Sequence, residues 1–475
     1  MNTQKAYEKV NKLLKKHHQV HLLAFWGQLD TIQKQNLLVQ IQELELAKID
    51  DLVTNCVTKP VTTSISAELV PAPFYSFSPS GPAQQSKYAR AVQLGKALIS
   101  SGKVAAFVVA GGQGTRLGFD GPKGNFPISP VTNKALFQIF AESVSAASKN
   151  YQSVCPWYIM TSPLNHAQTV EIFRSNDYYG LDKNDVFIFQ QGTLPNFRSD
   201  GKILMADKAQ LSCSPDGHGG SLKALYRSGA LEDMKRHGVE FISYFQVDNP
   251  LINIFDPLFI GLHVLAKAEM SSKALIKNGP YEKVGNFCLL DGKLTVIEYS
   301  DFPDELAEKK NLDGSLTFQL GSIAIHIISL AFVERLNVDG FSLPLHKAVK
   351  KIPHIDERGK LVEPDETNGV KLESFVFDAV PLASKSIILQ TLRSEEFAPT
   401  KNDTGIDSAE TTRQMMVARA AAWLESAGVT VPQKPDGSID CVLEIAPGFA
   451  LEKDDVKAKL NQIPPIKPGD KVYLA

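Results

Sequence analysis

The first 86 residues carry two kinds of pattern. Over residues 1–55, apolar positions such as Leu13 and Leu37 recur at helical spacing between charged and Gln residues, which predicts amphipathic helices. Asp30 stands where the second of these helices needs an N-cap. Residues 58–86 are rich in Pro, Ser and Thr, and this composition predicts a connecting, partly extended segment. We therefore expect an N-terminal helical region.

From residue 104 to about 395, short apolar runs alternate with helical segments, which is the pattern of a parallel α/β sheet. The run Val104–Ala110 contains no polar side chain, so we expect a strand buried on both faces. A helix beginning at Lys87 leads into this strand, and a hairpin is expected to turn at Asp291-Gly292. Further strands are expected at Trp157–Thr161, Val186–Gln190, Phe241–Val247 and Ala274–Lys277, with a last one running up to Lys401.

After residue 395 the pattern weakens to one helix over Ser408–Ser426, followed by Pro-rich and strand-like pieces. We interpret this part as a small C-terminal domain. The predicted boundaries are 1–86 for the N-terminal helical region and connecting segment, 87–395 for the main domain and 396–475 for the C-terminal domain.

Composition and charge narrow the function classes. Of 475 residues, 43% are hydrophobic and 21% are charged, with a formal net charge of −2, so we expect no nucleic acid and no membrane as partner. No apolar run reaches the ~20 residues of a membrane span, and the Lys-rich start lacks the apolar core of a signal peptide. Five scattered cysteines without C-x-x-C spacing predict reduced core thiols in a cytoplasmic protein.

A glycine-rich loop follows the first buried strand. Gly111, Gly112 and Gly114 lie within four positions, and Arg116 and Lys123 follow among three further glycines. Glycines let backbone N–H groups approach a ligand, and two fixed cations suit a polyphosphate. The residue order fits neither a P-loop, which needs Ser or Thr after the Lys, nor a dinucleotide fingerprint, whose third glycine comes one position earlier. We expect an exposed phosphate-binding loop in preference to a plain surface loop.

Polar residues follow several of the other expected strands, where ligands bind in an open α/β sheet. Gln191 offers a donor and an acceptor, which suit the edge of a uracil. Gly217 and His218 precede one long helix expected over 221–238, whose first N–H groups favour an anion or a sugar hydroxyl. Asp248 is a carboxylate suited to Mg²⁺ held mainly by phosphate oxygens. Each residue alone is also typical of an ordinary polar loop.

These motifs occur in the order found in the UDP-sugar pyrophosphorylases, which the chain resembles. Residues 111–124 match the family signature G-G-x-G-T-R-L-G…P-K-G, and P-D-G-x-G-G at 215–220, V-D-N at 247–249 and F-x-P-x-K-N at 397–402 follow. The resemblance spans roughly residues 85–425 and is closest to the UDP-N-acetylglucosamine branch. It implies an α/β fold with a central, mostly parallel, Rossmann-like (GT-A-like) nucleotidyltransferase sheet.

The resemblance also implies an activity and the residues that carry it. The activity is uridylyl transfer from UTP to a sugar 1-phosphate with release of pyrophosphate, supported by Mg²⁺ or Mn²⁺. The implied partners are these small substrates, and the sequence leaves the oligomeric state open. The implied residues are Arg116, Lys123 and Lys401 for catalysis, Asp248 for the metal, Gly111, Gly112, Gly114, Gln191, Gly217 and His218 for the nucleotide, and Gly285, Glu298, Ser322, Phe375 and Phe377 for the sugar.

Two positions depart from the N-acetylglucosamine branch. His218 and Ser322 stand where that branch has Asn, and the glucose branch has His in a similar motif, although it usually differs at Arg116. The resemblance as a whole still implies N-acetylglucosamine 1-phosphate as the preferred acceptor, and these departures leave glucose 1-phosphate as the alternative.

Two further function classes compete with this interpretation. A nicotinamide-dependent oxidoreductase is disfavoured by the glycine spacing and the two loop cations. A non-catalytic nucleotide-sugar sensor is disfavoured because the implied charged residues are all present.

Overall fold

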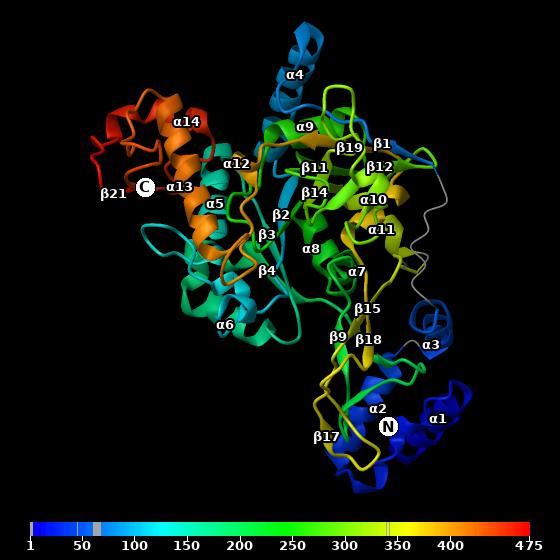
Figure 1. Ribbon diagram of the computed structural model, residues 1–475. Coiled ribbons are helices and arrows are strands. Elements are labelled where there is room, and N and C mark those ends of the chain that lie inside the picture. The colour runs from blue at the N-terminus through cyan, green and yellow to red at the C-terminus, as the bar shows by residue number, and fades with distance from the viewer. Residues whose placement is uncertain (1–2, 45, 60–67, 339, 342) are drawn as a thin grey trace. The chain divides into compact units, whose positions relative to one another are not determined.

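The computed structural model describes residues 3–44, 46–59, 68–338, 340–341 and 343–475, which form two compact units (Figure 1). Within the described residues, the smaller unit comprises 1–65, 192–221 and 342–376, and the larger unit comprises 66–191, 222–341 and 377–475. The chain passes several times from one unit to the other, and each unit has a hydrophobic core of its own.

The larger unit is built on a ten-stranded sheet. β2 (Val104–Val109) lies parallel to both β10 (Phe241–Gln246) and β3 (Trp157–Thr161), and β4 (Val186–Gln190) continues the parallel part beyond β3. All the side chains of β2 are buried, as expected for a strand covered on both faces. Because these four strands are parallel, their carboxyl ends lie at one edge of the sheet, and the loops that follow them meet there.

An antiparallel part continues the sheet beyond β10. β14 (Leu320–Ser329) pairs with β10, β11 and β12, and β12 and β13 form the hairpin predicted at Asp291-Gly292. The other strands with antiparallel pairings are β1 (Leu69–Pro71), β11 (Met270–Ile276), β12 (Gly285–Leu290) and β13 (Lys293–Ile297). β19 (Ser386–Gln390) pairs with β11 and is parallel to it. The predicted mostly parallel core is therefore confirmed, with antiparallel strands added on one side.

Two helices of the larger unit approach each other through glycines. α4 (Gly81–Ser100) and α9 (Pro257–Leu265) cross so closely that a Cβ added at Gly95 would lie 1.9 Å from the Pro257 carbonyl oxygen. Only a residue without a side chain allows this contact. The other helices outside the N-terminal and C-terminal parts are α5 (Leu136–Tyr151), α6 (His166–Ser175), α7 (Gly220–Arg227), α8 (Ala230–Arg236), α10 (Asp304–Ala307), α11 (Leu330–Val338) and α12 (Arg393–Glu396).

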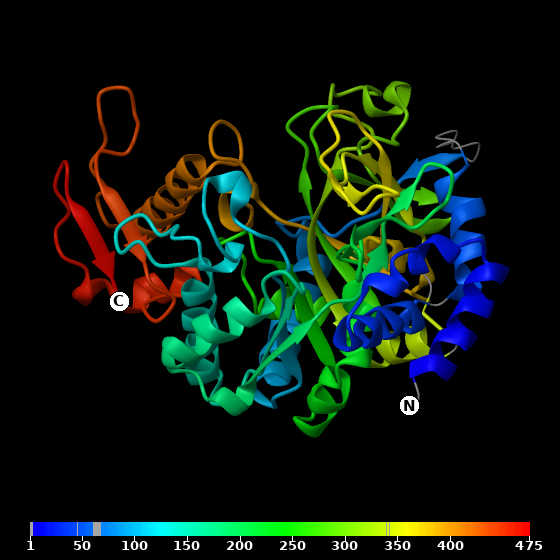
Figure 2. The same cartoon turned by 90° about the horizontal axis from the view of Figure 1, so that it is seen from below.

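The C-terminal part of the larger unit adds a small parallel sheet. The helix predicted over Ser408–Ser426 is confirmed as α13 (Ala409–Ser426), with Ser408 as its N-cap. It is followed by β20 (Val442–Ile445), α14 (Lys453–Ala458) and β21 (Lys471–Leu474). Figure 2 shows the two strands, in orange and red, on the same side as α13. Apolar side chains of all four elements form a separate cluster that includes Leu424, Leu443, Val456 and Leu474.

The smaller unit joins the N-terminal helices to two later excursions of the chain. α1 (Thr3–Lys16), α2 (Thr31–Glu43) and α3 (Leu46–Leu52) pack on a sheet of β6 (Phe197–Arg198), β15 (His346–Lys350) and β18 (Gly369–Glu373). Asp30 caps α2 as predicted, and Gln33 completes a capping box. Short strands complete the unit: β5 (Thr193–Pro195), β7 (Met205–Asp207), β8 (Gln210–Leu211), β9 (Cys213–Pro215), β16 (His354–Ile355) and β17 (Leu361–Val362).

Four local expectations were wrong. The helix expected from Lys87 begins at Gly81, because Pro82 fits the first turn and the Ser80 N–H finds the Gln84 side chain. The helix expected over 221–238 is two helices, since the chain turns at Gly229 (φ 81°). The strand expected to reach Lys401 ends at Gln390, and α12 intervenes. Cys213 is exposed, unlike the core thiol expected there.

A further strand is longer than expected. β11 begins at Met270, four residues before the predicted start, because Ser271 and Ser272 are buried yet bonded to imidazole nitrogens of His263 (2.7 Å) and His326 (2.9 Å). Two polar residues in sequence had concealed this part of the strand. Part of the predicted connecting segment, residues 60–67, lies outside the described residues. Among the described helices, none combines the length and the apolar character that a bilayer crossing requires.

Candidate active site

The glycine-rich loop is folded by its own hydrogen bonds. The Lys123 N–H donates to the Gly112 carbonyl (3.1 Å), and the Gly114 N–H donates to the Gly121 carbonyl (2.9 Å), so the loop turns back on itself. The side-chain amide of Asn165 donates to the carbonyls of Ala110 (2.9 Å) and Gly112 (3.2 Å). Asn165 is buried and was not singled out from the sequence, since nothing in its surroundings marks it. The loop is therefore held in shape without a ligand.

Two of the loop glycines are required by close neighbours. A Cβ at Gly111 would lie 2.4 Å from Oε1 of Gln191, and a Cβ at Gly124 would lie 2.1 Å from the Phe137 ring. The first contact brings Gln191, which follows β4, directly against the start of the loop. Two residues predicted for the nucleotide thus lie side by side in the structure.

Lys123 and Asp248 form the centre of the charged cluster. Lys123 Nζ lies 3.7 Å from Asp248 Oδ2, and only 16% and 15% of the two side chains is exposed. Burial lowers the pKa of Lys123; Asp248 opposes this, whereas Lys401 and Arg116 lower the pKa further. All the charged residues predicted for catalysis and metal binding therefore lie within electrostatic range of Lys123. Part of the loop, including Arg116, is exposed as expected, but the Lys123 side chain is mostly buried.

A polar residue next to Asp248 fixes the segment that precedes Lys401. The Asn249 side chain accepts from the Ala398 N–H (3.1 Å) and donates to the Glu396 carbonyl (2.6 Å). The Thr400 N–H in turn donates to the Asp248 carbonyl (2.9 Å). Asn249 was quoted in the V-D-N motif but given no role, although its place beside a predicted ligand was a usable signal.

The residues present suit a hard cation that is held mainly by its substrate. Among the described residues, no group of three or more His, Cys, Asp or Glu side chains forms a metal site. Asp248 is one carboxylate, and Asp407 is a second acid nearby. The pKa of Asp407 is raised, mainly by burial and also by Asp248, while Lys401 and Arg393 oppose this shift. Mg²⁺ commonly binds through one or two carboxylates plus phosphate oxygens, so this chain's acids fit Mg²⁺ bound together with a nucleotide.

Three of the predicted sugar residues come together on the antiparallel part of the sheet. Gly285 of β12 is paired with Ser322 of β14, and a Cβ at Gly285 would lie 3.8 Å from Glu298 Oε1. The Ser322 hydroxyl is buried and has no hydrogen-bond partner among the residues that the structure describes. A buried polar group without a partner costs free energy unless a ligand satisfies it. Phe377 is buried in the short helix over Val376–Leu382.

The remaining predicted residues form a group within the smaller unit. The His218 and Phe375 rings stack at 5.3 Å between centroids, and the His218 Nδ1 accepts the Val376 N–H (3.1 Å). A ring whose Nδ1 accepts carries its proton on Nε2, so His218 offers a donor where the related branch has an Asn amide. Gly217 (φ 83°) packs on the Ser374 backbone, where a Cβ would lie 2.3 Å from the carbonyl oxygen.

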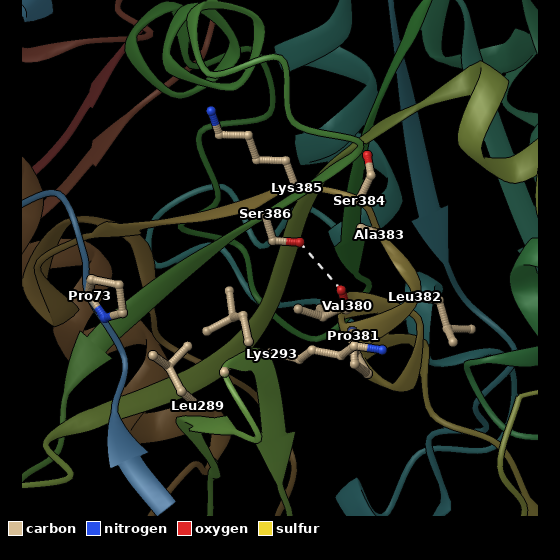
Figure 3. A pocket seen from close by; sticks show the side chains of 12 residues that line it. Pro73, Leu289, Lys293, Val380, Pro381, Leu382, Ala383, Ser384, Lys385 and Ser386 are labelled. Carbon is tan, nitrogen blue, oxygen red and sulfur yellow. Dashed lines mark hydrogen bonds between the residues drawn. The ribbon is translucent and has the colours of Figure 1, made fainter.

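A separate pocket of about 500 Å³ lies beside the β12–β13 hairpin (Figure 3). Its wall includes Leu289, Lys293 and the segment Val380–Ser386, in which the Ser386 hydroxyl donates to the Val380 carbonyl (3.4 Å). None of the residues that line it is among those predicted for the site. The charged cluster, and not this pocket, carries the chemistry expected from the sequence.

Comparisons with known proteins agree with this geometry. The family described as UTP--glucose-1-phosphate uridylyltransferase matches residues 81–474. The chain is 34% identical over 478 residues to the human UDP-N-acetylhexosamine pyrophosphorylase-like protein 1, covering 95% of this chain and 94% of that protein. It is 41% identical over 351 residues to the UDP-N-acetylglucosamine pyrophosphorylase of Saccharomyces cerevisiae, covering 71% of this chain and 73% of that protein.

A solved structure supports the fold. The crystal structure of the uridine diphosphate N-acetylglucosamine pyrophosphorylase from Trypanosoma brucei in complex with inhibitor matches with a TM-score of 0.83 at 24% identity, covering 100% of this chain and 98% of that one. Together with the family match over most of the chain and the loop, acid and lysines at one sheet edge, these findings show that the chain belongs to the UDP-sugar pyrophosphorylase family of nucleotidyltransferases.

Proposed function

We propose that this protein transfers the uridylyl group of UTP to N-acetylglucosamine 1-phosphate and releases pyrophosphate. The observation that carries the proposal is the convergence of Arg116, Lys123, Asp248 and Lys401 on one charged cluster, which lies at the carboxyl ends of β2 and β10. Relatives of this chain are named for UDP-N-acetylglucosamine and UDP-N-acetylhexosamine, which supports the choice of acceptor. A cytoplasmic location remains a prediction.

The proposed reaction needs alignment and charge neutralisation more than a general base. A sugar phosphate oxygen attacks the α-phosphorus of UTP in line; the new O–P bond forms as the bond to the β-phosphate oxygen breaks, and pyrophosphate carries away the electron pair. In this scheme Lys123 and Arg116 hold the UTP phosphates, and Lys401 holds the incoming phosphate. Asp248 would hold Mg²⁺, which, when bound, would neutralise charge on the phosphate oxygens.

Lys123 is suited to this task because its charge is only partly neutralised by the protein. Its Nζ lies 3.7 Å from the nearest Asp248 oxygen, which is longer than a hydrogen bond. A lysine whose own side chain is mostly buried and whose ammonium retains donor capacity would bind a phosphate oxygen strongly, since little water competes there.

Glucose 1-phosphate is the second candidate acceptor, and specific residues favour it. Ser322 is shorter than the Asn of the N-acetylglucosamine branch, and its buried hydroxyl has no partner in the described structure. His218 matches the residue of the glucose branch. We expect measurable use of glucose 1-phosphate beside the acetylated sugar.

The decisive experiment is a pyrophosphate-release assay with UTP and a panel of sugar 1-phosphates. We expect the highest kcat/KM for N-acetylglucosamine 1-phosphate and lower values for N-acetylgalactosamine 1-phosphate and glucose 1-phosphate. A higher value for glucose 1-phosphate would assign the enzyme to that acceptor. The same panel with ATP, CTP and GTP tests the uridine preference, and pyrophosphate release at equal rates from all four nucleotides would contradict it.

A further inference from the structure

The phosphate loop continues directly into a hairpin. Leu136 donates its N–H to the Phe126 carbonyl (3.2 Å), Ile128 donates to the Lys134 carbonyl (2.9 Å), and Pro127 is bridged to Ala135. The hairpin over 126–136 begins immediately after the 3-10 turn Lys123–Asn125. Any displacement of the hairpin is therefore passed on to the turn that carries Lys123.

A carboxylate from the C-terminal part holds the tip of this hairpin. Glu444, in β20, is only 6% exposed. Its Oε2 accepts the N–H groups of Val131 and Thr132, both at 2.8 Å, and its Oε1 accepts the Thr132 hydroxyl at 2.5 Å. Hydrogen bonds to an ionised acceptor are roughly twice as strong as those between neutral groups. One side chain therefore satisfies three donors at the end of the hairpin.

Two further residues of the C-terminal part contact the same hairpin. Tyr473 of β21 is paired in register with Glu444, and its hydroxyl accepts from Lys134 Nζ (2.6 Å). Arg413 of α13 donates to the Pro127 carbonyl (2.9 Å). The tip, the side and the base of the hairpin are each bonded to the C-terminal part.

The hairpin tip lies beside a cavity. This cavity, of about 850 Å³, borders Ser129, Pro130 and Glu444. Loss of the carboxylate would therefore give the tip open space into which it can move. At the other end the connection to Lys123 is firm, because the Phe126 N–H donates to the Lys123 carbonyl (3.0 Å) and the Lys123 N–H donates to the Gly112 carbonyl (3.1 Å).

We propose that Glu444 is a positioning residue for uridylyl transfer, acting through the hairpin over 126–136 on the placement of Lys123. The inference rests on the phosphate-binding role proposed above for Lys123. The C-terminal part then contributes to the reaction, because it holds the end of the phosphate loop in the geometry that the transition state requires. A displacement of about 1 Å at such a site lowers the rate by up to ~100-fold.

Glu444→Gln tests the proposal with little change in volume. One amide oxygen can still accept the Val131 and Thr132 N–H groups, but the negative charge and the acceptor for the Thr132 hydroxyl are lost, so the tip should be held more weakly. We expect kcat/KM for UTP to fall about tenfold, with KM for UTP raised and KM for the sugar 1-phosphate unchanged. Glu425→Gln, an exposed carboxylate on α13, is the matched control and should behave as wild type. Unchanged kinetics in Glu444→Gln would overturn the proposal.

A double-variant cycle separates positioning from general damage. If Glu444 acts through Lys123, then adding Glu444→Gln to Lys123→Ala should cost less than twofold, because the residue being positioned is already absent. A further tenfold loss in the double variant would show that Glu444 acts elsewhere and would overturn the inference. If Lys123→Ala itself kept normal turnover, the proposed role of Lys123 would fail, and the positioning proposal with it.

Thr132→Val provides a second test if Glu444→Gln unfolds at too low a temperature for its kinetics to be measured. It removes the hydroxyl that donates to Oε1, and with it the bond to the Ser129 hydroxyl (3.0 Å), and leaves the carboxylate in place. We expect a two- to fivefold loss in kcat/KM for UTP, of the size that one hydrogen bond contributes, and faster amide exchange in residues 126–136 than in wild type. Wild-type exchange together with wild-type kinetics would contradict the proposal.

Discussion

Two buried lysines in the larger unit show how differently the same side chain can be used. Lys273 is 2% exposed, and its Nζ lies 2.6 Å from both Asp256 and Glu396. Burial pushes the pKa of Lys273 down, but the two carboxylates outweigh this effect and the pKa is raised. For Lys123 the balance is the reverse: burial prevails over the single acid Asp248, and the pKa is lowered. The charge of Lys273 is therefore neutralised by carboxylates of the protein, whereas the charge of Lys123 is neutralised only in part.

The comparison shows how a structural ion cluster can be told from a ligand site. Glu396 is also bonded to the Thr391 hydroxyl (2.6 Å) and the Asn253 N–H (3.2 Å), so no charge in the Lys273 cluster lacks a partner. In a buried cluster whose charges the protein itself satisfies, removal of one member destabilises the fold. Polar groups held in place but left incompletely satisfied, such as Lys123 and the Ser322 hydroxyl, have the capacity to bind a substrate.

The largest effect is expected from removing Lys273 from its cluster with Asp256 and Glu396. Lys273→Met removes the ammonium that lies between the largely buried carboxylates of Asp256 and Glu396, which should lower the free energy of unfolding by about 3–5 kcal/mol. Urea unfolding followed by circular dichroism measures this. Adding Glu396→Gln to Lys273→Met removes one of the orphaned charges and should restore part of the loss. A decrease below about 1 kcal/mol in the single variant would contradict the structural role.

The next largest effect is expected at Lys123, whose charge the protein neutralises only in part. Lys123→Ala should lower kcat by about 10²–10³-fold, because a donor aimed at transition-state charge is lost, while the unfolding free energy stays near that of wild type. Steady-state kinetics and urea unfolding are compared in the same preparation. Lys183→Ala, an exposed lysine, is the control. Near-normal turnover at saturating substrate would remove Lys123 from the mechanism.

Asp248→Asn tests the acid that faces Lys123. The amide keeps the shape but loses the charge that a hard cation requires, so we expect about a hundredfold lower kcat/KM, on the order of 3 kcal/mol. Activity should also depend on added Mg²⁺ or Mn²⁺. Titration of each metal in wild type and variant should show weaker apparent metal affinity in the variant. Full wild-type activity in excess EDTA would argue against a metal at this acid.

The smallest effect is expected at Ser322. If its buried hydroxyl is part of the sugar pocket, Ser322→Asn adds a longer donor and acceptor close to Gly285 and Glu298. One such hydrogen bond is worth ~1 kcal/mol, or several-fold in selectivity. The ratio of kcat/KM for N-acetylglucosamine 1-phosphate to that for glucose 1-phosphate should therefore rise. An unchanged ratio would mean that Ser322 does not determine the choice of sugar.

The sequence by itself determined the elements whose signals are local. The apolar run of β2, the turn at Asp291-Gly292 and the cap at Asp30 all depend on neighbours within a few residues. Strands with buried polar residues were underestimated, because partners far along the chain satisfy Ser271 and Ser272. The ordered motifs also indicated the family, which the comparisons confirm.

Only the tertiary structure decided which charges meet and how completely each is neutralised. The glycine-rich loop marks Lys123 in the sequence and nothing marks Lys273. Neither pattern indicates how completely each charge is neutralised, yet Lys123 faces a single acid at 3.7 Å and Lys273 faces two at 2.6 Å. The contact of Glu444 with the hairpin tip joins residues more than 300 positions apart. Local sequence carries no record of such contacts, because electrostatic interactions and hydrogen bonds depend on distances that are set only when the sheet and the C-terminal part pack together.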